Sequence, residues 1–214
     1  MSKTLPLSRP SFAAAIDALR RDLLHEGGPH ISTMRNHRFA LLVVEPKDEI
    51  ALRREVQALS IELERGGWTV LSISLKRLLL DRIQRLGPDW AQWVIETEQA
   101  LSAYDPARAL ESVKEALAPL IEGPDGLAAD CAQIIQAHAK ANPGAADRTL
   151  ALIGHAGALF PFFRSSALLR HLDGRTGEIP VVLLYPGTRT GDHGLSFMGV
   201  LRPDSDYRPR IYSA

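Results

Sequence analysis

The sequence has almost no cysteine and no surplus of charge of either sign. Cys131 is the single cysteine among 214 residues, which excludes an intramolecular disulfide and a cysteine-based zinc site. Lysine plus arginine and aspartate plus glutamate number 25 each, which argues against a strongly basic DNA-coating protein. The apolar runs are far shorter than the roughly 20 residues that span a bilayer, and residues 1–10 lack the apolar segment of a signal peptide. We therefore expect a cytoplasmic protein with a reduced thiol.

The motifs of several common enzyme classes are also absent. The chain contains neither the G-x-x-x-x-G-K-[ST] of phosphate-binding loops nor the G-x-G-x-x-G of dinucleotide-binding folds. It has no G-x-S-x-G nucleophile elbow, and its histidines never take the H-E-x-x-H or H-x-x-E-H spacing of zinc enzymes. The sequence therefore predicts no catalytic residue, no metal site and no cofactor, and we expect a protein that is not an enzyme.

The chain does contain an alternation of apolar strands and amphipathic helices. Nearly continuous apolar runs are typical of parallel strands buried on both faces, and they occur at Arg38–Glu45, Arg148–Gly154 and Ile179–Tyr185. Trp68–Leu75 is a further predicted strand. Helical periodicity fills the segments between them. This alternation predicts an α/β fold, a three-layer sandwich with a mostly parallel sheet.

The length predicts a single α/β domain over residues 1–214. Residues 76–143 carry helical patterns and no strand pattern, so we expect a helical insertion within that domain. Helices are also predicted at Ser11–His25, after Asp48 as the N-cap, and at Ala158–Leu172. Leu195–Val200 and Arg208–Tyr212 are predicted as short strands at an edge of the sheet.

Ligands of open parallel sheets bind at the carboxyl ends of the strands. Three predicted strands end in irregular segments that can line one crevice: Glu45-Pro46-Lys47-Asp48, Gly154-His155-Ala156-Gly157 and Pro186-Gly187-Thr188-Arg189. Glu45 and Asp48 are a possible Mg²⁺ pair, but nothing else completes such a site, and the helix cap is the favoured interpretation of Asp48.

The second of these segments is a candidate anion site. Its glycines allow backbone N–H groups to approach a ligand, and the N-terminus of the predicted helix adds partial positive charge. The candidate ligand residues are Gly154, His155, Gly157 and Arg164, the last lying one to two turns into that helix. The alternative is that the glycines only form a tight strand-to-helix turn and that His155 makes a structural hydrogen bond.

Two other features are interpreted as packing. Trp90 and Trp93 lie three residues apart on one predicted helical face, a pattern more typical of a core than of a base-stacking platform. Cys131 is expected to be a small core residue rather than a nucleophile.

Several ordered motifs of the chain resemble those of a known family. They are VVEPKDEIALRREVQAL, a V-L-x-I-x-L strand before a leucine-rich helix, LIGHAGALFPFFRSS, IPVVLLYPG, GLSFMG and DYRPRIY. In this order they resemble the BrxB family, a component of BREX (bacteriophage exclusion) anti-phage systems. The resemblance covers nearly everything from Arg38 onward apart from the helical middle. Its matching positions are Gly154, Gly157, Phe160, Pro161, Tyr185, Pro186, Gly187, Phe197, Tyr207, Arg208 and Tyr212.

The resemblance implies a cytoplasmic phage-defence protein with no established enzymatic activity and no catalytic motif to carry over. The BREX set of the family contains an adenine methyltransferase (PglX), an alkaline-phosphatase-like protein (PglZ) and a large ATPase (BrxC). The resemblance implies that the chain is an assembly partner of these larger proteins, and a PglZ-like protein is the expected partner.

The residue types at the matching positions suit protein contacts better than acid–base chemistry, because they are mostly glycine, proline and aromatic residues. The two short terminal strands also offer an edge that a partner can extend. We therefore expect a partner interface at Tyr185, Pro186, Gly187, Phe197, Tyr207, Arg208 and Tyr212. An equal alternative is that Tyr207, Arg208 and Tyr212 merely pin the C-terminus to the domain.

Two rival functions stay open. One is a degenerate nucleotide- or phosphate-binding protein that uses the Gly154–Gly157 loop and Arg164. The other is a DNA-contacting subunit that uses Arg53-Arg54 or Arg208 with Arg210. The balanced charge argues against strong nucleic-acid binding by the chain alone, and no contact with a membrane is expected.

Overall fold

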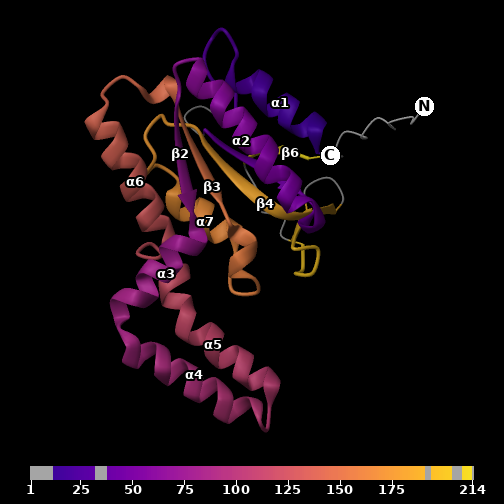
Figure 1. Cartoon of the computed structure of the whole chain (residues 1–214), viewed down its shortest axis with the longest axis vertical. Coiled ribbons are helices and arrows are strands. Elements are labelled where there is room, and N and C mark those ends of the chain that lie inside the picture. The colour runs from indigo at the N-terminus through magenta and orange to yellow at the C-terminus, as the bar shows by residue number, and fades with distance from the viewer. Residues whose placement is uncertain (1–11, 32–37, 191–193, 204–208, 214) are drawn as a thin grey trace, which may run out of the picture.

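A parallel sheet forms the centre of the computed structural model, which describes residues 12–31, 38–190, 194–203 and 209–213 (Figure 1). Its strands are β1 (Phe39–Val44), β2 (Thr69–Ser74), β3 (Thr149–Gly154), β4 (Val181–Thr190), β5 (Gly194–Phe197) and β6 (Arg210–Tyr212). The strand order is β2-β3-β4-β1-β6, all parallel, and β5 pairs antiparallel with the far end of β4. The α/β fold and the mostly parallel sheet are thus confirmed.

Seven α-helices accompany the sheet in the described part of the chain. They are α1 (Ala13–Leu23), α2 (Glu49–Arg65), α3 (Leu75–Leu86), α4 (Pro88–Ser102), α5 (Pro106–Ile121), α6 (Leu127–Ala141) and α7 (Ser165–Leu172). Asp105 caps α5 by accepting hydrogen bonds from the N–H groups of Ala107 and Arg108. Asp48 lies at the N-cap position of α2, as predicted, but its side chain makes no capping hydrogen bond. No described helix has the length and apolarity needed to cross a membrane.

The central strands are buried on both faces, as their continuous apolar runs predict. In β1, Leu41 packs into one hydrophobic cluster with helices α6 and α7, whereas its neighbour Leu42 packs into a second cluster with α1 and α2. Both side chains are fully buried. Because successive side chains of a strand point to opposite faces, this alternation places helices on each side of the sheet and produces three layers.

The segment between β2 and β3 is helical throughout its described elements, from α3 to α6. Helix α6 packs on the sheet and contributes Leu127, Cys131 and Ile135 to the core. Helix α4 contributes no buried residue. Together with α5 it forms a hairpin that extends away from the sheet (Figure 1). The part of this segment that leaves the sandwich is therefore the α4–α5 hairpin rather than the whole of residues 76–143.

The predicted helix at Ala158–Leu172 is wrong over its first half. A 3₁₀ turn covers Ala156–Leu159, and α7 begins only at Ser165. Phe160 is extended, with ψ 136°, because the ring of Pro161 disfavours the helical conformation in the residue before it. Ser165 and Ser166 consequently lie in the first turn of α7.

The predicted loop Pro186–Arg189 is also wrong, because β4 continues through it. Pro186 pairs with Val44 of β1, and Gly187 to Thr190 pair with β5. A β-carbon at Gly187 would collide with the carbonyl oxygen of Ser196 and the ring of Tyr185. This close approach explains why a glycine occupies the position where β5 folds back on β4.

Candidate functional site

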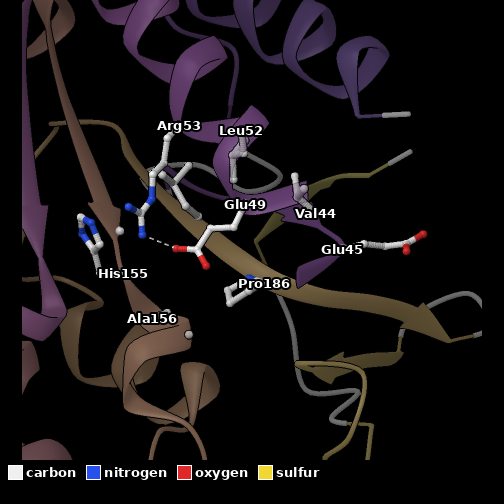
Figure 2. Close-up of a pocket in the computed structure, with 11 residues that line it drawn as sticks. Val44, Glu45, Glu49, Leu52, Arg53, His155, Ala156 and Pro186 are labelled. Atoms are coloured by element: carbon white, nitrogen blue, oxygen red, sulfur yellow. Dashed lines mark hydrogen bonds and ion pairs between the residues drawn. The ribbon is translucent and has the colours of Figure 1, made fainter. Parts of the chain in front are cut away.

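A cavity of about 60 Å³ lies at the carboxyl ends of β1 and β3, beside Leu184 and Pro186 in the middle of β4 (Figure 2). Its lining includes Glu45, His155 and Pro186, so the structure brings the three predicted segments together. After β1 the chain continues into α2 on one face of the sheet, and after β3 it continues into α7 on the other. A crevice of this kind, where connections leave to opposite faces, is the usual ligand site of an open parallel sheet.

The polar side chains of the cavity come mainly from the first turns of α2. Arg53 donates a 2.7 Å hydrogen bond to the carboxylate of Glu49, one helical turn earlier. Glu45 points away from this pair (Figure 2) and instead forms a 2.7 Å ion pair with Lys47. The hydrogen bond that Lys47 donates to the Glu45 carboxylate raises the pKa of the Lys47 ammonium. Among the described residues, no three His, Cys, Asp or Glu side chains are grouped so that they could hold a metal ion.

His155 lies at the mouth of the cavity in an uncommon backbone conformation. Its φ is +61°, in the left-handed region that few residues other than glycine adopt. The residue is exposed, and its ring makes no hydrogen bond within the described part of the chain. The structural hydrogen bond considered for His155 is therefore not observed.

A larger cleft of about 470 Å³ adjoins the cavity on the side of α3. Glu49, Arg53, His155 and Gly157 line both spaces. Lys76 and Arg77, in the first turn of α3, add two cations to the cleft, and Asp81 adds a carboxylate. Cationic groups thus outnumber anionic ones along this cleft.

Arg164 does not belong to this crevice. It lies at the N-cap position of α7, its side chain is 70% exposed, and its nearest ion-pair partner is Glu122 at 4.0 Å. It lines a separate groove with Phe197 and Arg202. The loop after β3 also leads into a four-residue 3₁₀ turn rather than an α-helix. The structure therefore separates Arg164 from Gly154, His155 and Gly157, and no helix dipole of the kind expected lies behind the loop.

The glycines of this loop serve close packing. A β-carbon on Gly157 would lie 3.3 Å from both the sulfur of Met198 and the ring of Pro186. Gly154 is buried at the end of β3, where Leu184 of the neighbouring strand passes over it. This geometry matches the alternative of a tight turn after the strand.

The residues expected at a partner interface are mostly interior. Tyr185 is fully buried, Phe197 is 5% exposed and Tyr212 is 4% exposed. The rings of Tyr185 and Phe197 meet edge to face, with centroids 5.5 Å apart. Pro186 and Gly187 are buried as well, while Tyr207 and Arg208 lie outside the described residues. Side chains buried in this way pack the domain and offer little surface to a partner.

Two of the four arginines considered for DNA contact form ion pairs within the chain. Arg53 pairs with Glu49, and Arg210 forms a 2.7 Å ion pair with Asp22. Arg54 is exposed, and Arg208 lies outside the described residues.

Two features of the surface were not predicted. Lys76 and Arg77 follow Ser74, the N-cap residue of α3, at the carboxyl end of β2. The sequence signal was available, because these cations come directly after a predicted strand. The second feature is Trp93, which is 55% exposed on α4 although the spacing of the two tryptophans predicted a core position.

The comparison with protein families gives one match. A family model described as BREX protein BrxB matches residues 71–211, well over half of the chain. No curated protein and no solved structure matches this chain. The matched span includes the helical segment that the motif resemblance left out, and it begins after the VVEPKDEIALRREVQAL motif.

Proposed function

Because the chain belongs to the BrxB family of BREX proteins, and is thereby a component of a phage-defence system, we propose that it is a non-catalytic assembly module of that system. In this role it binds larger BREX proteins in the cytoplasm, with a PglZ-like, phosphatase-fold protein as its main partner. The observation that carries the proposal is the family match over residues 71–211, which spans β3, β4, β5 and all helices from α3 to α7.

The chemistry of the crevice supports a role without catalysis. General acid–base and nucleophilic catalysis need a nucleophile or acid with a partner base within hydrogen-bond reach. In the crevice, the Glu49 carboxylate is paired with Arg53, and the His155 ring makes no hydrogen bond to any residue that the structure describes. The thiol of Cys131 is fully buried in the core and lines neither the cavity nor the cleft.

Affinity purification from cells that express the whole defence system tests the proposal. We expect the tagged chain to retain a PglZ-like protein, identified by mass spectrometry, and the purified chain to hydrolyse neither ATP nor DNA. An empty tag and an unrelated tagged protein of similar size are the controls. Recovery of the chain without any BREX protein, or turnover by the purified chain, would contradict it.

The basic cleft favours one second candidate function, the binding of a phosphate-bearing ligand. Arg53, Lys76 and Arg77 line a space of about 470 Å³ at the carboxyl edge of the sheet, a common position for such ligands. Titration calorimetry with ATP, GTP and short oligonucleotides tests this candidate. Micromolar binding that is lost in Arg77→Ala and kept in Arg164→Ala would support it, because Arg164 lines a different groove. The absence of binding heat with all three ligands would reject it.

A further inference from the structure

The α4–α5 hairpin contains α4, the one α-helix of the described chain that has no buried residue. Helix α4 has fifteen residues and none of them is buried. Its neighbours are α5 and α3, and the hairpin stands clear of the sheet (Figure 1). Its own internal seam consists of the half-buried Trp90, Val94 and Leu101, which are spaced by four and seven residues and therefore share one face.

Trp93 lies outside that seam. It is 55% exposed. Tryptophan is among the residue types that contribute most binding energy when a partner covers them, so an exposed tryptophan marks a surface suited to protein contacts. Asp89 lies four residues before it and Glu96 three residues after it, so both carboxylates flank the indole on the same face of α4. We call Asp89, Trp93 and Glu96 the acidic tryptophan face.

The charge of this region is of one sign. Residues 86–107 contain no lysine, arginine or histidine, although such residues are frequent in the rest of the chain. The same stretch carries four carboxylates, Asp89, Glu96, Glu98 and Asp105. No described cation pairs with the three on α4, and Glu96 accepts a hydrogen bond of 2.8 Å from the neutral amide of Gln92. The acidic tryptophan face is therefore locally anionic in a chain whose total charge is zero.

We propose that the acidic tryptophan face docks a basic segment of a partner protein, in which an arginine or lysine stacks on Trp93 and neighbouring cations pair with Asp89 and Glu96. A cation over an indole ring is attracted by the electrons of the ring, and two flanking carboxylates strengthen that attraction. A nucleic acid or an anionic membrane would be repelled by the same carboxylates. The inference rests on the proposed assembly function and adds to it the surface and the chemistry of the partner.

Two substitutions test this surface separately for its ring and for its charge. Trp93→Ala removes the aromatic platform, and Glu96→Lys reverses one flanking charge. The matched controls are Ile50→Ala, which removes a side chain that is 71% exposed on α2, and Glu64→Lys, which reverses an exposed charge at the far end of α2. Thermal unfolding of all four variants checks that each one folds.

The measurement is the amount of each BREX protein that the tagged chain retains on affinity purification from cells that express the whole system. The purification is repeated with increasing salt concentration in the wash buffer. We expect Trp93→Ala and Glu96→Lys each to reduce retention of the main partner by about tenfold or more, as loss of a central interface residue does. The two controls should retain it as the unmodified chain does, and added salt should weaken retention because the contact is between charges.

The outcomes separate this inference from the proposed function. If the unmodified chain retains a BREX protein and both hairpin variants retain it equally well, the acidic tryptophan face is not the docking surface, although the assembly function stands. If the unmodified chain retains no BREX protein, both proposals are contradicted. If light scattering shows a dimer that Trp93→Ala dissociates, the face binds a second copy of the chain, and the basic-partner proposal is overturned.

Discussion

The hydroxyl of Tyr212 donates a 2.7 Å hydrogen bond to the carboxylate of Asp22, which joins the edge strand β6 to helix α1. Arg210 forms a 2.7 Å ion pair with the same carboxylate, and its guanidinium carbon lies 5.3 Å from the centre of the Tyr212 ring. Burial, followed by the hydrogen bond to Asp22, raises the pKa of Tyr212 well above its usual value of 10. These three residues hold the C-terminal strand against the domain.

Removal of this hydroxyl is expected to destabilise the protein. We predict that Tyr212→Phe lowers the free energy of unfolding by about 1–2 kcal/mol, because Asp22 loses a hydrogen bond in a largely buried setting. Urea denaturation followed by circular dichroism measures the change. Tyr104→Phe, at a position that is 92% exposed, is the control and should have no measurable effect. Equal stability of the two variants would contradict the prediction.

The ion pair between Arg82 and Asp130 is expected to hold α3 against the start of α6. Arg82 bonds both carboxylate oxygens of Asp130 and also donates to the carbonyl oxygens of Asp125 and Gly126, at 2.7 and 2.8 Å. Both charged side chains are about 15% exposed. We predict that Arg82→Ala costs about 3 kcal/mol of unfolding free energy, since it leaves a carboxylate that is only 14% exposed without its partner.

The exposed pair of Glu49 and Arg53 is the matched control for that measurement. Its side chains are 42% and 59% exposed, so water screens the attraction. Arg53→Ala should change the unfolding free energy by only about 0.5 kcal/mol. A cost for Arg82→Ala no larger than that for Arg53→Ala would show that the Arg82 network does not stabilise the protein.

The buried thiol of Cys131 predicts a loss of stability at alkaline pH. Burial, assisted by the nearby charge of Asp130, raises the pKa of this thiol from 9.0 to about 12. The contribution of the Cys131 thiol to stability is complete below pH 9 and is lost as the pH rises toward 12. In that range the thiol ionises in the unfolded chain but stays protonated in the folded one. Tyr212, whose pKa is also raised, acts in the same direction.

Urea denaturation at pH 8 and pH 10.5, under reducing conditions, measures this dependence. We expect the fall in unfolding free energy between the two pH values to be smaller in Cys131→Ala than in the unmodified chain. The native thiol should also resist alkylation at pH 8, since it is fully buried and protonated. An identical pH dependence in the two proteins, or rapid alkylation of the native thiol, would contradict the assignment.

The left-handed backbone of His155 predicts an unusual order of stability among its variants. Glycine adopts a φ of +61° without steric cost, whereas a β-branched residue does not. We expect His155→Gly to be at least as stable as the unmodified chain and His155→Val to be less stable by about 1–2 kcal/mol. Thermal unfolding of the three proteins gives the order, and a more stable valine variant would contradict it.

The sheet was predictable because its strands carry a strong and local signal. The run FALLVV in β1 is buried at all six positions, as is TLALIG in β3, and a continuous apolar run of this length is typical of a strand that is covered on both faces. The start of α5 has an equally local basis, since the carboxylate of Asp105 accepts hydrogen bonds from the next free N–H groups and Pro106 suits the first helical position.

The candidate site was predictable only in part. The meeting of the three segments follows from the order of the parallel strands. The path of the chain after His155 depends on Pro161, and the apolar periodicity of the segment obscured the effect of this proline. The position of Trp93 was not predictable from spacing, because two tryptophans three residues apart can face either a core or solvent. Only the packing of α4 on α5 decides which of the two rings is covered.

The pairing of β6 with β1 has a consequence for the order of events during synthesis. The outer edge of β1 finds its partner only after residues 45–209 have followed it out of the ribosome. A nascent or truncated polypeptide without Arg210–Tyr212 therefore carries an open edge on a strand whose six residues are all buried in the folded protein. Expression of shortened chains is accordingly expected to yield aggregates, and any fusion joined beyond Tyr212 needs a linker long enough to let this last strand close the sheet.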